Sequence, residues 1–94
     1  MCFNEHQTRL WRNMISLIED FRKGKIQYSN VVYGLEGALN AGDFKDEILI
    51  KRWYDFWTPL EILFATKGDS TSIEDADKYL SAMKVFLKNR SDLT

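Results

Sequence analysis

The chain contains one cysteine, one histidine and one proline, and each scarcity narrows what the protein can be. Cys2 has no partner for an internal disulfide, which is typical of proteins from a reducing compartment. A structural zinc site needs four thiolate or imidazole ligands, and Cys2 and His6 are the only two side chains of these kinds. We therefore expect the protein to hold no metal and no cofactor.

Long apolar runs are missing as well. The run from Leu60 to Thr66 is interrupted by Glu61 and falls far short of the roughly 20 residues that a membrane helix needs. The first residues have neither the basic start nor the apolar stretch of a secretion signal. The expectation is a cytoplasmic protein without a membrane segment.

Neither sign of charge is in excess, because the chain has 13 basic and 14 acidic residues. This balance gives no field that would draw the protein to nucleic acid. A helix-turn-helix reader would use the helix after the tight link at 40–43, and its charges cancel. They are Lys45, Lys51 and Arg52 against Asp46, Glu47 and Asp55. We expect no nucleic-acid partner.

Hydrophobic residues make up 45% of the chain, and their spacing follows the helical period. No stretch alternates with the period of a strand. Amphipathic patterns predict five helical segments, at 4–23, 29–41, 43–57, 58–67 and 71–90. Gly24, Gly42 and Gly68 follow these patterns, as glycines with positive φ do at helix ends. The sequence therefore predicts an all-α bundle of four to five helices, with residues 1–94 forming a single domain.

Helix starts are expected at residues that can cap backbone N–H groups. Thr58, Pro59 and Glu61 have the order of an N-cap, a first-turn proline and a capping-box glutamate. We therefore expect a bend or break at Pro59, with a proline-kinked continuation as the alternative. The other N-cap candidates are Asn4 with Gln7 three residues on, Ser29, Asp43, and Thr71 with Glu74 three residues on.

An aromatic cluster occupies residues 53–57. On a helix, Trp53 lies on one edge of a broad apolar arc, and Tyr54 and Trp57 lie on the other. Such a width favours the central helix of a small bundle. The alternative is that one edge stays exposed as an anchor for another protein, since tryptophan and tyrosine are enriched at binding hot spots. In that case Tyr54 and Trp57 are the candidate binding residues.

The segment 29–41 carries a strip of small residues, formed by Gly34, Gly37 and Ala41. Each helical glycine costs roughly 1 kcal/mol relative to alanine, so something should offset this cost. Either two helices of this chain cross closely there, or the backbone of a partner approaches. Residues that could hydrogen-bond such a partner, or simply be solvated, lie one turn apart beside the strip: Tyr33, Glu36 and Asn40.

Catalytic groups are hard to find. Glu61 is accounted for by the expected capping box, and Asp55 can pair with Lys51 one turn away. General acid–base catalysis needs carboxyl groups held together in a cleft. We therefore expect no enzyme; a remote alternative is catalysis by Glu36 with Tyr33 and Tyr54.

One overall pattern resembles small all-helical immunity proteins of bacterial toxin systems. It consists of Phe21-x-x-Gly24-x-Ile26, a helix with Leu35-Glu36, Trp53-x-x-x-Trp57, and Leu60-Glu61, and it covers roughly residues 17–66. The resemblance implies binding to a cognate toxin and blocking of its active site. Many immunity proteins against nucleases are more acidic than this chain.

These observations favour a non-catalytic module that binds another protein, which could be a toxin. The candidate binding residues are Tyr33, Glu36, Asn40, Tyr54 and Trp57. The alternative is a self-associating structural or regulatory protein, in which the same surfaces form a homodimer. Exposure of the candidate side chains in one patch would favour binding, and their burial would remove the basis for it.

Overall fold

The computed structural model describes residues 3–91 and is built of four α-helices and one short 3₁₀ turn. Cys2 lies outside the described residues. The elements are α1 (Glu5–Arg22), α2 (Tyr28–Ala41), α3 (Glu47–Lys67), η1 (Gly68–Ser70) and α4 (Ile73–Ser91). The prediction of an all-α bundle is confirmed, since residues 3–91 contain no strand.

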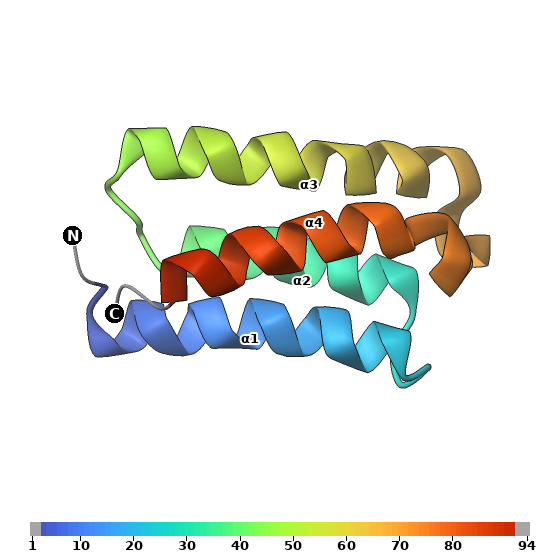
Figure 1. Ribbon diagram of the computed structural model, residues 1–94, viewed down its shortest axis with the longest axis horizontal. Coiled ribbons are helices and arrows are strands. Elements are labelled where there is room, and N and C mark those ends of the chain that lie inside the picture. Colours follow the sequence, from blue (N-terminus) through green and yellow to red (C-terminus); the bar gives the residue numbers. More distant parts are fainter. Residues whose placement is uncertain (1–2, 92–94) are drawn as a thin grey trace.

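Successive helices run in opposite directions along the long axis of the molecule, as Figure 1 shows. α1 packs against α2 and α4, and α3 packs against the same two helices from the other side. The short links between successive helices produce this antiparallel order. No helix in the described part of the chain is both long and apolar enough to cross a membrane.

Buried tryptophans connect helices on opposite sides of the core. Trp11 of α1 is fully buried, and its indole N–H donates to the carbonyl of Leu87 in α4 over 2.8 Å. Trp53 of α3 is also fully buried, and its indole N–H points to the sulfur of Met14 in α1 at 3.4 Å. A buried donor left without an acceptor costs about 1–3 kcal/mol, so these contacts select one helix register.

α3 runs through Pro59 as one helix, so the predicted break is wrong and the helix continues through the proline, as in the alternative. Burial explains the continuity: Trp57 before the proline and Leu60 after it both reach the core, which one continuous helical face allows. Two hydrogen bonds to α2 flank the site. Tyr28 donates its phenol to the carbonyl of Leu60 over 2.8 Å, and Trp57 donates its indole N–H to the carbonyl of Val32 over 2.9 Å.

The N-cap of α1 is the residue that the sequence predicts, whereas the N-caps of α2 and α3 are residues other than the predicted ones. Asn4 and Gln7 form the predicted capping box of α1. The N-cap of α2 is Gln27 rather than Ser29, and that of α3 is Asp46 rather than Asp43. Asn4 and Asp46 cap their helices through side-chain oxygens, whereas at α2 the Asn30 side chain accepts from the N–H of Gln27 over 3.1 Å.

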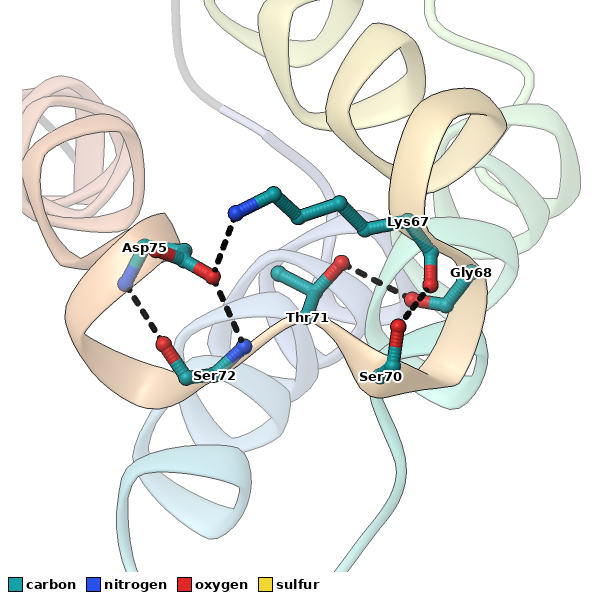
Figure 2. Close-up of polar contacts among 6 residues, drawn as sticks. All are labelled: Lys67, Gly68, Ser70, Thr71, Ser72 and Asp75. Atoms are coloured by element: carbon teal, nitrogen blue, oxygen red, sulfur yellow. Dashed lines mark hydrogen bonds and ion pairs between the residues drawn. The ribbon is translucent and has the colours of Figure 1, made fainter.

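The N-cap of α4 also lies one residue later than predicted, as Figure 2 shows. Ser72, not Thr71, caps α4: its hydroxyl accepts from the N–H of Asp75 over 3.0 Å, and the Asp75 carboxylate accepts from the Ser72 N–H. Thr71 is buried and donates to the carbonyl of Gly68. Lys67 pairs with Asp75 over 2.9 Å, and this hydrogen bond lowers the pKa of Asp75.

Two of the three predicted helix-ending glycines have a positive φ, namely Gly24 at 75° and Gly68 at 58°. Gly42 does not, because its φ is −77°, and the positive φ in that link belongs to Asp43 at 49°. Gly42 has a different reason to be glycine. The ring of Phe44 folds back over it and occupies the space that a Cβ would need.

α1 and α4 are joined at their surface by ion pairs. Arg22 donates to Asp77 and to Ser81, both over 2.5 Å, and Lys84 pairs with Glu19. The hydrogen bond from Lys84 lowers the pKa of Glu19 below its ordinary value of 4.5, and partial burial offsets only part of this effect. The carboxylate form of Glu19 therefore stabilises the contact between the two helices.

Pro59→Ala should raise the free energy of unfolding by about 2 kcal/mol. A proline inside a helix costs ~3 kcal/mol or more, and only about 0.4–1 kcal/mol of this is regained by restricting the unfolded chain. Urea unfolding followed by circular dichroism measures the change. If Pro59 instead began a new helix, alanine would be neutral or destabilising, which would contradict the continuous α3.

Glu19→Gln should lower the stability at neutral pH and lose this effect in acid. Because the pKa of Glu19 is lowered in the folded state, its contribution is present above the unfolded value of 4.5 and disappears as the pH falls through the lower native value. Unfolding curves measured from pH 7 to pH 2 test this. Glu61→Gln, on the exposed side of α3, is the control and should follow the wild-type curve.

Candidate protein-binding face on α2

The exposed side of α2 is unusual in composition. Its exposed residues, named the α2 face from here on, are Asn30, Tyr33, Gly37, Asn40 and Ala41. None of them is charged. The single charged residue of the helix, Glu36, is half-buried on the side toward α3.

The other three helices show the ordinary pattern of a solvated surface. Exposed charged residues include Arg9 and Arg12 on α1, Lys51 and Arg52 on α3, and Glu74, Asp77 and Lys78 on α4. Among the described helices, α2 alone exposes no charge. Depletion of charge, together with tyrosine, distinguishes the cores of protein–protein interfaces from the rest of a protein surface.

Tyr33 is the most prominent side chain of the α2 face. It is 61% exposed, one of the few large hydrophobic residues of the described chain that is more than half accessible. The ring is not loose, because its edge meets the ring of Phe64 in α3 at a centroid distance of 5.4 Å and an angle of 81°. A tyrosine held in place by a neighbour loses little entropy when a partner covers it, which suits a binding anchor.

The two helical glycines of α2 differ in what surrounds them. A Cβ on Gly34 would approach the end of the Leu17 side chain in α1 to 2.9 Å, so Gly34 serves the close approach of α1 and α2. A Cβ on Gly37 would meet nothing within 4 Å. Within this chain, Gly37 therefore carries the helix cost of glycine without a packing reason.

A shallow groove of about 510 Å³ runs between α1 and α2 beside this face. Leu10 and Leu17 of α1 and Ala38 of α2 form its apolar part, and Gly34 and Gly37 keep it open. Asn13, Ser16 and Asp20 of α1 also line the groove, so this part is polar and carries one carboxylate. The α2 face is thus continuous with an open apolar surface that a neighbouring polypeptide can cover.

Glu36 and Tyr54, two of the predicted binding residues, meet at the boundary of α2 and α3. The phenol of Tyr54 donates to the carboxylate of Glu36 over 3.2 Å. Burial raises the pKa of Tyr54, and the charge of Glu36 and this hydrogen bond raise it further. Among residues 3–91, Glu36 belongs to no group of three or more metal-ligating side chains. The pair fixes α2 against α3 beside the α2 face.

Trp57 is buried, contrary to the alternative in which its edge of the helix stays exposed. It is 7% exposed, and its indole N–H is occupied by the carbonyl of Val32. Both edges of the broad apolar arc of α3 are covered, one by α2 and the other by α4. Of the five predicted binding residues, Tyr33 and Asn40 are exposed, Glu36 and Tyr54 are half-buried, and Trp57 is buried.

The feature that sequence reasoning missed is the absence of charge over a whole helix. The signal is present in the sequence, since Glu36 is the only charged residue between Tyr28 and Ala41. The charge balance of the whole chain does not reveal it. Counting the charges on the predicted outer face of each helix would have singled out this segment.

Comparisons of this chain with protein-family models, with curated proteins and with solved structures find no match. The resemblance to immunity proteins therefore stays a prediction. The α2 face is identified by the exposure, composition and backbone geometry of its own residues.

Gly37→Ala should raise the free energy of unfolding by about 1 kcal/mol, because alanine favours the helix and nothing obstructs its methyl group. Gly34→Ala is the matched comparison on the same helix, and its gain should be smaller because Leu17 must move. Thermal and urea unfolding of both variants measure the difference. A loss of stability in Gly37→Ala would show that Gly37 has a structural role after all.

Proposed function

We propose that this protein is a non-catalytic module that binds another polypeptide through the α2 face. The observation that carries the proposal is the absence of charge from every exposed residue of α2, while the other three helices expose several charges each. A surface that only faces water has no reason to exclude charge, whereas the core of an interface does.

Each residue type on the face suits a part of this task. Tyr33 offers a large, pre-positioned aromatic surface. Asn40 offers both a hydrogen-bond donor and an acceptor in its amide. Gly37, without a side chain, lets a partner approach the helix backbone. Together they provide an anchor, a polar contact and room between them.

The partner in this proposal is a protein, and a toxin neutralised by occlusion of its active site is the class that the resemblance implies. Inhibition of that kind needs no reacting groups on the inhibitor. It needs a surface that stays in place when covered. The hydrogen bonds that join α2 to α3 on either side of Pro59 supply that rigidity.

Gly37→Arg is the variant that tests the proposed function. The new side chain projects from an open position, so the fold should be retained while any partner on the α2 face meets a long cation. Tagged wild type and variant are used to capture proteins from cells that naturally express the chain, with quantification by mass spectrometry. We expect the specific partner to fall at least about tenfold, which corresponds to ~1.4 kcal/mol of binding.

The matched control is Ile62→Arg. Ile62 is 59% exposed on α3, away from α2, so the control adds the same charge to a different surface. It should capture as much partner as the wild type. Equal capture by wild type, Gly37→Arg and Ile62→Arg would refute a binding role for the α2 face.

A further inference from the structure

We draw no further inference here: the strongest candidate, the groove between α1 and α2 beside the α2 face, combines apolar and small residues with the carboxylate of Asp20, and nothing in the structure shows what covers it.

Discussion

The buried indole and phenol donors are the constraint on which the rest of the structure depends. Each one sits in the core, where an unmade hydrogen bond costs about 1–3 kcal/mol, and each finds its acceptor on a different helix. A helix that slid or rotated would lose both the packing of its aromatic ring and this bond. The pairs are Trp11 with Leu87, Tyr28 with Leu60, Trp57 with Val32, and Trp53 with Met14.

This constraint decides which side of α2 is exposed. Tyr28 donates from α2 to α3, and Val32 accepts from α3, so the helix is tied to its neighbour at two successive turns. With these positions held inward, Gly37 and Tyr33 face outward. The continuity of α3 through Pro59 matters for the same reason. Phe64 supports Tyr33, and Tyr54 holds Glu36, from opposite sides of the proline on one helix.

Features of this fold that depend on the sequence pattern of one helix could be predicted, and features that depend on packing between helices could not. The amphipathic helices were predictable because their apolar stripes are many residues long and leave no other solution. The break at Pro59 was predicted from the local order Thr58-Pro59-Leu60-Glu61, and burial of Trp57 and Leu60 on one face overrides it. The burial of Trp57 could not be predicted, because a broad apolar arc on one helix does not reveal how many neighbouring helices cover that arc.

α2 is poorly equipped to be a helix by itself, and this points to the role of its surface. It has two glycines, two β-branched valines, no acidic residue in its first turn and no basic residue in its last. Other elements support its ends: Asp69 of η1 accepts from the N–H of Ser29 over 2.8 Å, and Gln7 of α1 donates to the carbonyl of Gly42 over 3.0 Å.

Because this support comes from its neighbours, α2 can omit the charged residues and strong helix formers that stabilise the exposed faces of ordinary helices. The omission weakens the helix, and the described contacts within the chain give Gly37 no compensating role. Under the proposed function, a covering polypeptide would supply the missing compensation, since it would bury Tyr33 and use the space that Gly37 leaves open. The stability of the bundle alone does not account for the composition of α2.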